Sequence, residues 1–201
     1  MIRVDLHVHT TYSPDASINP KTIVDQLYAH PSIKALAITD HNTVEGYYKV
    51  QELASSYPDI LIIPGVEIST TSGDIIVLGT TALPAEPRTV KNVIDYAKEK
   101  GALTIAAHPY RAYGLGDLTR KYNVDAIEVL NGASPPDVNK LAENLAKEMH
   151  LPGVAGSDAH QPTDLWTVYT EVQASLRVDE ILEAIKQGLV RVASTRLLTD
   201  F

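Results

Sequence analysis

Short apolar strands alternate with amphipathic helices along this chain, and that alternation limits the folds that it can adopt. The segment at 60–69, ILIIPGVEIS, is apolar at almost every position, which is typical of a strand buried on both faces of a sheet. The segment at 89–101, TVKNVIDYAKEKG, instead places Val90, Val93 and Ala97 on one helical face. Strands that alternate with such helices predict an α/β domain.

The whole chain divides into segments of these two kinds. Strands are expected at 2–6, 33–40, 60–69, 74–80, 102–108, 125–131, 151–160, 167–172 and 190–195. Helices are expected at 19–31, 42–57, 89–101, 135–150 and 178–189. At the start of the second helix, Asn42 and Glu45 have the spacing of a capping box. We expect a single domain over residues 1–201 that folds as a closed or nearly closed barrel.

Length, charge and composition exclude several classes of protein. A chain of 201 residues can bury its own core, and no apolar run approaches the roughly 18 to 20 residues of a membrane span. The first ten residues, MIRVDLHVHT, lack the apolar stretch of a secretory signal, so we expect a cytoplasmic protein without a membrane partner. A net charge of -8 argues against binding duplex nucleic acid. The absence of cysteine excludes a thiolate nucleophile or ligand.

Polar and titratable side chains follow six of the expected strands, each time at the carboxyl end. They are His7 and His9, Asp40 and His41, Glu67, His108, Asn131, and Asp158 and His160. In a β/α barrel the carboxyl ends of the strands converge on one face, where active sites lie. We therefore expect these side chains to meet in one pocket.

The spacing of these residues predicts metal binding. Residues i and i+2 of an extended chain face the same way, so His7 and His9 project together and Val8 points away. Asp158 and His160 repeat this spacing near the other end of the chain. Imidazole and carboxylate together suit Zn, Mn or Fe, and the pattern does not choose among them.

The two remaining histidines have a different setting. His30 and His150 lie in the last turns of expected helices, where a cation interacts favourably with the helix dipole, and we interpret both as structural. Four carboxylates accompany the other five histidines, namely Asp15, Asp40, Glu67 and Asp158. Burying so many titratable groups together is costly unless a metal ion neutralises them.

Five segments, in chain order, resemble the motifs of the PHP (polymerase and histidinol phosphatase) superfamily. They are DLHVHTTYSPDA, ITDHNT, PGVEIST, AHPY and GSDAH, and they extend from residue 5 to residue 160. The resemblance implies a distorted (β/α)7, TIM-like barrel with a metal site at the C-terminal face of the strands. It also implies a metal-dependent phosphoesterase that holds two or three divalent metal ions.

The resemblance further implies which residues bind each ion. The three groups are His7, His9, Glu67 and Asp158 for one metal; Glu67 and His108 for a second; and Asp15, His41 and His160 for a third. Many members of the superfamily supply a further histidine or cysteine near the end of the sixth strand, where this chain has Asn131. A carboxamide oxygen is a weaker ligand than imidazole, so we expect the second metal to be labile or completed by water.

Phosphoester hydrolysis through a metal-activated water follows from such a centre. Candidate acids for the leaving group are His160 and Asp40, which the sequence does not separate, and Asp40 could equally orient a ligand histidine. Arg111 follows His108 in HPYR. Its guanidinium matches phosphate geometry, although an ordinary surface arginine is the competing interpretation.

The substrate is expected to be a small phosphorylated molecule, with a nucleotide or short oligonucleotide as candidates. Tyr110 and Tyr113 either stack on a base or pack on the barrel rim. Alternatives are a 5′–3′ exonuclease acting on short oligonucleotides and a non-catalytic, metal-stabilised module of a larger assembly. An amidohydrolase with a carboxylated lysine is disfavoured, because the chain has no lysine between Lys49 and Lys91.

Overall fold

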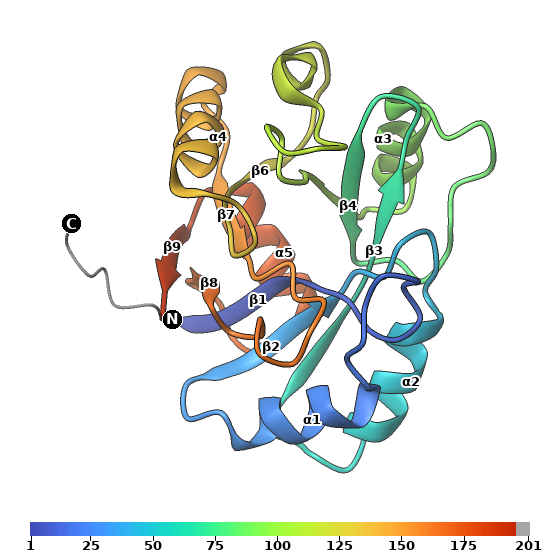
Figure 1. The fold of residues 1–201 in the computed structure, drawn as a ribbon, viewed down its shortest axis with the longest axis vertical. Helices are drawn as coiled ribbons and strands as arrows, with labels where there is room; N and C mark the ends of the chain where they lie inside the picture. The colour runs from blue at the N-terminus through green and yellow to red at the C-terminus, as the bar shows by residue number, and fades with distance from the viewer. Residues whose placement is uncertain (196–201) are drawn as a thin grey trace.

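Nine strands of the computed structural model form one continuous sheet (Figure 1), and the model describes residues 1–195. The order of strands across the sheet is β7-β6-β5-β4-β3-β2-β1-β8-β9. The strands are β1 (Ile2–Val8), β2 (Ile33–Ile38), β3 (Leu61–Ser69), β4 (Asp74–Leu78), β5 (Leu103–Ala106), β6 (Ala126–Asn131), β7 (Gly153–Gly156), β8 (Val168–Val172) and β9 (Val190–Ser194). The helices are α1 (Pro20–Ala29), α2 (Glu45–Ala54), α3 (Val90–Glu99), the 3-10 helix η1 (Gly116–Lys121), α4 (Pro136–Met149) and α5 (Val178–Lys186).

The sheet is mixed rather than purely parallel. Strands β1, β2 and β3 are parallel neighbours, as are β5, β6 and β7. Strand β4 is antiparallel to both β3 and β5, because the short turn at 70–73 returns the chain without a helical crossover. Strands β8 and β9 also pair antiparallel, next to β1. The predicted α/β barrel is confirmed, and these antiparallel strands are where it departs from regular β/α alternation.

The barrel closes between β1 and the segment that follows β7. Val8 forms a parallel bridge with Ala159, the backbone N–H of His9 donates to the carbonyl of Ala159, and the N–H of Asp158 donates to the carbonyl of His7. The first half of β1 pairs instead with β8. The seam thus places the two pairs of residues with i, i+2 spacing beside each other.

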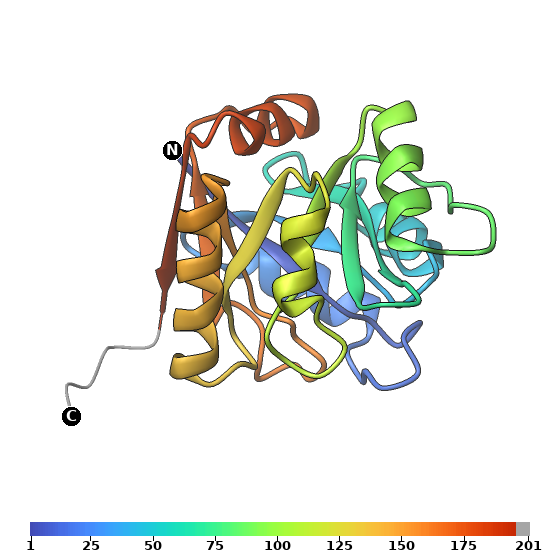
Figure 2. The ribbon, with the colours of Figure 1, turned by 90° about the horizontal axis from the view of Figure 1, so that it is seen from above.

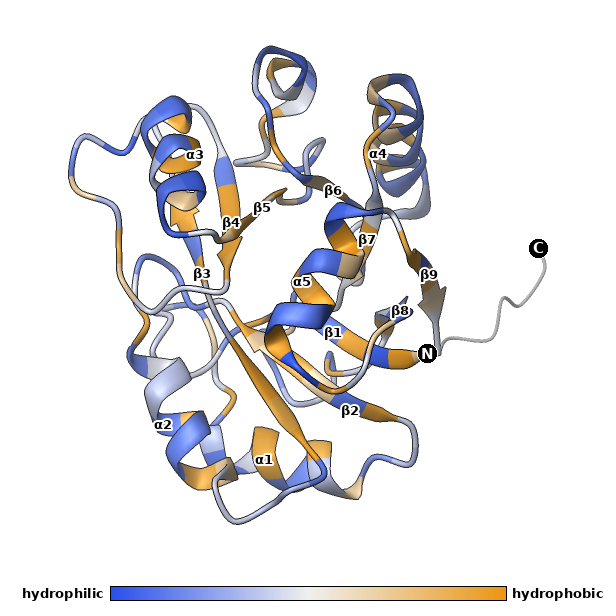
Figure 3. Ribbon diagram, turned by 180° about the vertical axis from the view of Figure 1, so that it is seen from behind, coloured by the Kyte–Doolittle hydropathy of each residue, from blue (hydrophilic) through white to orange (hydrophobic). Residues whose placement is uncertain are grey.

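Helices cover the outside of the sheet. Helices α1 and α2 pack side by side against β2 and β3, whereas α3 and α4 cover the part of the sheet that contains β4 to β7 (Figures 1 and 2). Figure 3 shows mainly hydrophobic strands and helices with one hydrophobic side, as this packing requires. Among residues 1–195 we find no helix with the length and apolar character needed to cross a membrane.

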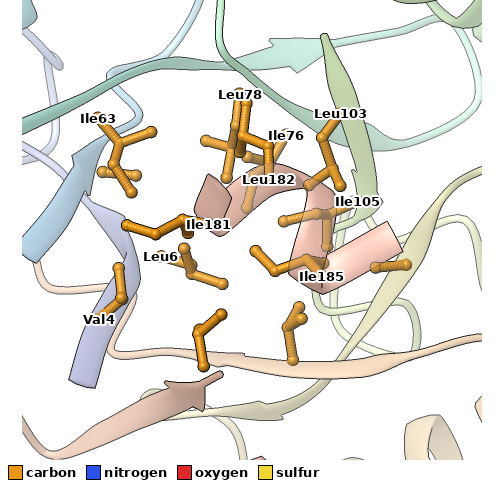
Figure 4. Close-up of a cluster of buried hydrophobic side chains, with 14 of the residues drawn as sticks. Val4, Leu6, Ile63, Ile76, Leu78, Leu103, Ile105, Ile181, Leu182 and Ile185 are labelled. Atoms are coloured by element: carbon orange, nitrogen blue, oxygen red, sulfur yellow. The ribbon is translucent and has the colours of Figure 1, made fainter. Parts of the chain in front are cut away.

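Helix α5 closes one end of the barrel. Its residues Ile181, Leu182 and Ile185 point among apolar side chains of the strands, including Val4 and Leu6 of β1 (Figure 4). Figure 2 shows α5 at one end and the loops after β1 and β7 at the opposite end. The apolar floor leaves the carboxyl ends of the parallel strands as the place where buried polar side chains gather.

The predicted capping box at the start of the second helix is wrong. Helix α2 begins at Glu45, and Val44 occupies the N-cap position without a side-chain hydrogen bond. Asn42 instead adopts a left-handed backbone conformation with φ of 56°. Its Oδ1 accepts from the backbone N–H of Ser69 at 3.1 Å and from Arg88 Nη1 at 2.9 Å. This side chain therefore cross-links two loops, a contact that the local sequence does not encode.

Candidate metal centre

A β-bulge in β1 turns the first two site histidines toward the barrel mouth. Between Asp5 and Val8, β1 contains one more residue than the stretch of β2 that it pairs with, and such an insertion re-aims the following side chains. Leu6 therefore packs into the floor, while His7 and His9 face the mouth with their Nε2 atoms 3.0 Å apart. Val8 points away into the cluster beneath α1 and α2, as the spacing predicts.

Hydrogen bonds to the other ring nitrogens fix the tautomers of these two histidines. His7 Nδ1 lies 2.9 Å from Glu128 Oε1 and can only donate to this carboxylate. The hydroxyl of Ser13 donates to Asp40 at 2.7 Å, so its oxygen accepts from His9 Nδ1 at 3.1 Å. Each neutral ring then carries its free lone pair on Nε2. Two lone pairs that face each other across 3.0 Å repel unless a cation lies between them.

Two carboxylates complete this group. Glu67 Oε2 lies 3.3 and 3.4 Å from the Nε2 atoms of His7 and His9, and Asp158 Oδ1 lies 3.3 Å from each. Burial lowers the pKa of His7, but the carboxylates of Asp158, Glu128 and Glu67 outweigh burial and hold that pKa well above its ordinary value. The electrostatic environment of the site therefore favours a positive charge at this position. These buried nitrogen and oxygen donors fit a divalent metal ion.

A second group lies around the other oxygen of Glu67. His108 Nε2 lies 2.9 Å from Glu67 Oε1, and the backbone N–H of His108 donates to Glu128 Oε2 at 2.8 Å. Within residues 1–195, His108 Nδ1 is buried without a hydrogen-bond partner. Because its two oxygens face different histidines, Glu67 can bridge two ions.

A third group forms the more exposed rim. His41 Nδ1 lies 3.1 Å from Glu67 Oε2, and Asp15 Oδ2 lies 3.4 Å from His41 Nε2 and 3.3 Å from His160 Nε2. The rings of His41 and His160 lie 4.5 and 4.3 Å from the ring of His9. Imidazoles of His9, His41 and His160 can therefore approach a common ion.

Arg111 and Asn131 meet the outer oxygen of Asp158. Arg111 Nη1 donates to Asp158 Oδ2 and, at 3.2 Å, to Asn131 Oδ1. Asn131 Nδ2 donates to Asp158 Oδ2 at 3.1 Å and to Glu128 Oε2 at 3.0 Å. Asp158 is thereby held on one side by these donors, while its Oδ1 faces the histidines.

The carboxyl-terminal part of the chain matches a known family. The family model described as PHP-associated matches residues 136–190. An uncharacterized protein of Methanocaldococcus jannaschii is 33% identical over 156 residues, which cover 71% of this chain and 90% of that protein. The chain belongs to the PHP superfamily.

Solved structures share the fold of this PHP chain. PsfC from Pseudomonas syringae matches with a TM-score of 0.75 and 22% identity, covering 98% of this chain and 93% of its own. An amidohydrolase from Chromobacterium violaceum matches with a TM-score of 0.65 and 18% identity. The match covers 79% of this chain and 88% of that protein. A proposed metal-dependent phosphoesterase from Bifidobacterium adolescentis matches with a TM-score of 0.63 and 16% identity. The match covers 78% of this chain and 87% of that protein. At these identities the likeness establishes the barrel.

The PHP barrel brings every predicted site residue to one end, although their roles as ligands and catalysts stay predictions. These residues are His7, His9, Asp15, Asp40, His41, Glu67, His108, Arg111, Asp158 and His160. Asp40 is fully buried and also accepts from the N–H and hydroxyl of Thr10 at 2.7 and 2.8 Å. Of the two roles that the sequence left open for Asp40, its contacts fit the orientation of His9 through Ser13.

Sequence reasoning missed two buried acids of the mouth. Glu128 supports His7 and His108 from β6, and a glutamate within the otherwise apolar DAIEVLN was the available signal. Asp74 opens β4 beside Glu67 and His108. Burial, reinforced by the charge of Glu67, raises the pKa of Asp74 to about 6. In the sequence, Asp74 could have been found from the short turn at 70–73, which joins it to the strand of Glu67.

The two helix-end histidines lie apart from this centre, as predicted, but the predicted reason is wrong for His30. Its Nδ1 accepts from the N–H groups of Ser32 and Ile33 at 3.2 and 2.8 Å, which requires a neutral ring. Burial, followed by Lys34, lowers the pKa of His30. His150 follows α4 in a left-handed conformation with φ of 55°. His30 therefore follows α1 as a neutral acceptor rather than as a cation.

Proposed function

We propose that this PHP protein is a metal-dependent phosphoesterase that hydrolyses a small phosphorylated molecule. The observation that carries the proposal is the convergence of the His7 and His9 Nε2 atoms with oxygens of Glu67 and Asp158. Arg111 lies directly beside this centre, on the outer oxygen of Asp158. Metal ions and a guanidinium both stabilise negatively charged oxygens, so together they suit a phosphate.

The proposed ligands follow the three groups of contacts. They are His7, His9, Glu67 and Asp158 for the first ion, Glu67 and His108 for the second, and Asp15, His41 and His160 for the third. Divalent ions at such a centre supply Lewis acidity and lower the pKa of water, so no serine or cysteine nucleophile is required. Glu128, Ser13 and Asp40 would keep the imidazole rings oriented through the hydrogen bonds described above.

Arg111 is proposed to bind and orient the phosphate. Within residues 1–195, the contacts of its guanidinium to Asp158 and Asn131 use Nη1 alone, so the donors on Nε and Nη2 remain for a ligand. The side chain is 33% exposed, which allows a substrate to reach it. The pinned Nη1 fixes the plane of the guanidinium and thereby the direction of the remaining donors.

His160 is the proposed proton donor to the leaving group. Its Nδ1 donates to the backbone carbonyl of Asp158 at 2.9 Å, and its Nε2 faces the half-exposed rim near Asp15. A proton on Nε2 can pass to a departing oxygen only while this nitrogen holds no ion. The acid and ligand roles of His160 are therefore alternatives at any one time, and the metal content of His160→Ala distinguishes them.

The substrate is proposed to be small, with a nucleotide as the leading candidate. A cavity of about 450 Å³ adjoins the centre at Asp74, lined by the turn at 69–74 and by Tyr113 and Gly114. The net charge of -8 opposes a long polyanion. A short oligonucleotide presents the same terminal phosphate and is the second candidate.

The test is a screen of nucleoside monophosphates, other phosphomonoesters and short oligonucleotides with Mn, Zn and Fe added separately. We expect turnover of at least one small phosphate, abolished by chelation and in His9→Ala, and retained in the matched variant His150→Ala. Metal-dependent thermal stability without turnover of any substrate would instead indicate a non-catalytic module. Degradation of long single strands, with affinity that rises with length and falls steeply with salt, would indicate an exonuclease.

A further inference from the structure

Asp74 faces the barrel mouth from the hairpin that also carries Glu67. In this antiparallel pair Ser69 lies opposite Asp74, and Glu67 lies opposite Ile76. Residues that oppose each other point to the same side, and so do residues two apart on one strand. Glu67 and Asp74 are therefore diagonal neighbours on one face of the hairpin, with their carboxylates directed to the same space.

The donor atoms of three buried residues gather there. One ligand atom each from Glu67, Asp74 and His108 lies within 4.8 Å of the other two. Asp74 is only 6% exposed and His108 7%. The backbone of Asp74 is fixed, since its N–H donates to the carbonyl of Tyr113 at 2.7 Å. Two buried carboxylates at this separation repel each other unless a cation or a proton joins them.

The side chain of Asn131 has no atom free to bind a metal ion. This residue stands where many members of the superfamily have a further ligand. Its Oδ1 accepts from Arg111 Nη1, from the N–H of Ala133 at 3.0 Å and from Ser134 Oγ at 3.1 Å. Its Nδ2 donates to two carboxylates, described above. A flipped amide would set NH2 against N–H donors and oxygen against carboxylates, so the contacts fix its orientation.

We propose that Asp74 is a protein ligand of the divalent cation held by Glu67 and His108. It supplies a carboxylate oxygen from β4 in place of a side chain from β6. The inference rests on the proposed metal centre, although it does not depend on which reaction that centre performs. The sequence offered the neutral amide of Asn131 at this site. The carboxylate of Asp74 is anionic and therefore binds a hard divalent ion more strongly.

Substitution at Asp74 tests this assignment by metal binding alone. Asp74→Asn should lose about one manganese ion per chain in equilibrium dialysis, or bind it at least about tenfold more weakly in calorimetry. The control is Asp95→Asn, which changes an exposed carboxylate on α3, outside the barrel mouth. We expect the control to keep the full metal count. An unchanged count and affinity in folded Asp74→Asn would overturn the proposal.

A spectroscopic test keeps a metal-binding side chain at position 74 instead of removing it. The chain contains no cysteine, so a thiol at position 74 would be the sole thiolate. Asp74→Cys loaded with Co²⁺ should show thiolate-to-cobalt charge-transfer absorption, and Asp95→Cys on α3 should not. Cobalt binding to Asp74→Cys without this band would refute direct coordination. Wild-type protein that binds all its ions but hydrolyses no phosphate would refute the proposed function and leave this inference intact.

Discussion

The two ends of the barrel both contain fully buried side chains but are built from opposite chemistry. At the floor, Ile181 and Ile185 are 0% exposed among aliphatic side chains. At the mouth, His7, His9 and Glu67 are also 0% exposed, yet their ring nitrogens and carboxylate oxygens face polar or charged groups. Apolar burial stabilises the floor without any ligand, whereas the mouth carries charges whose desolvation must be offset by a cation. The same strands thus provide stability at one end and a binding site at the other.

The largest expected effect comes from removing a donor of the mouth. His9→Ala and Asp158→Ala should each lower phosphoesterase turnover by about 10³-fold or more, a barrier increase of about 4 kcal/mol, because each removes a ligand from the first group. His150→Ala, at the end of α4, should retain full turnover. Steady-state kinetics with added manganese measures the difference.

Circular dichroism must accompany those assays, since loss of a ligand also removes metal-linked stability. Comparable losses of turnover in His150→Ala, with the fold intact, would contradict the division between mouth and helix-end histidines.

A change at the floor should affect stability and leave the mouth alone. Ile185→Ala removes buried methyl groups from the apolar cluster and should lower the free energy of unfolding by about 2–5 kcal/mol, as measured by urea denaturation. Metal content and turnover per folded molecule should remain those of the wild type. A reduced metal count under native conditions would show that the two ends are energetically coupled.

Asp40→Asn should have an intermediate effect on metal binding, because the Asp40 carboxylate reaches the mouth indirectly, through hydrogen bonds with Ser13 and Thr10. Asp40→Asn should weaken metal binding by about 10- to 100-fold, measured by calorimetry, while exposed Asp95→Asn on α3 serves as the control. If Asp40 were instead the general acid, metal affinity would stay unchanged and the pH–rate profile would lose one limb.

His30→Ala should have the smallest effect, a loss of stability that depends on pH. Its pKa is lowered in the folded protein, so folding favours the neutral ring. The stabilisation is therefore present above the ordinary pKa of about 6.5 and is lost as pH falls through the lower folded value. His30→Ala should be less stable than wild type by about 1 kcal/mol at about pH 8, and urea titrations should show this gap closing under acid conditions. A gap that widens in acid would mean that the ring is charged.

Local spacing was sufficient to predict which histidines meet. The period of two in extended chain places His7 with His9, and Asp158 with His160. Their position at the carboxyl ends of strands places both pairs at the same mouth. Both rules depend only on the order of residues, and the structure has these side chains in contact.

The remaining features depend on strand register, which local sequence does not specify. In β6 one extra residue lies between Glu128 and Leu130 relative to β7, so Glu128 and Asn131 both face inward despite their odd spacing. Asp74 joins the site only because the hairpin pairs Ser69 with it. Asn42 does not cap α2 as expected, and its side chain instead accepts hydrogen bonds from Ser69 and Arg88 on other segments. Each depends on a pairing formed by the assembled sheet.

The seam between β1 and the segment after β7 also has a consequence for biosynthesis. The N–H of Ser157 donates to Asp5 Oδ1 across 152 positions of sequence. Such a contact forms only after a long stretch of chain has been synthesised and ordered, at the full entropic cost of closing that loop. A nascent chain on the ribosome therefore carries its first histidines long before their partners emerge. The first group of donors, which includes Asp158, is complete only after the segment through His160 has docked onto β1.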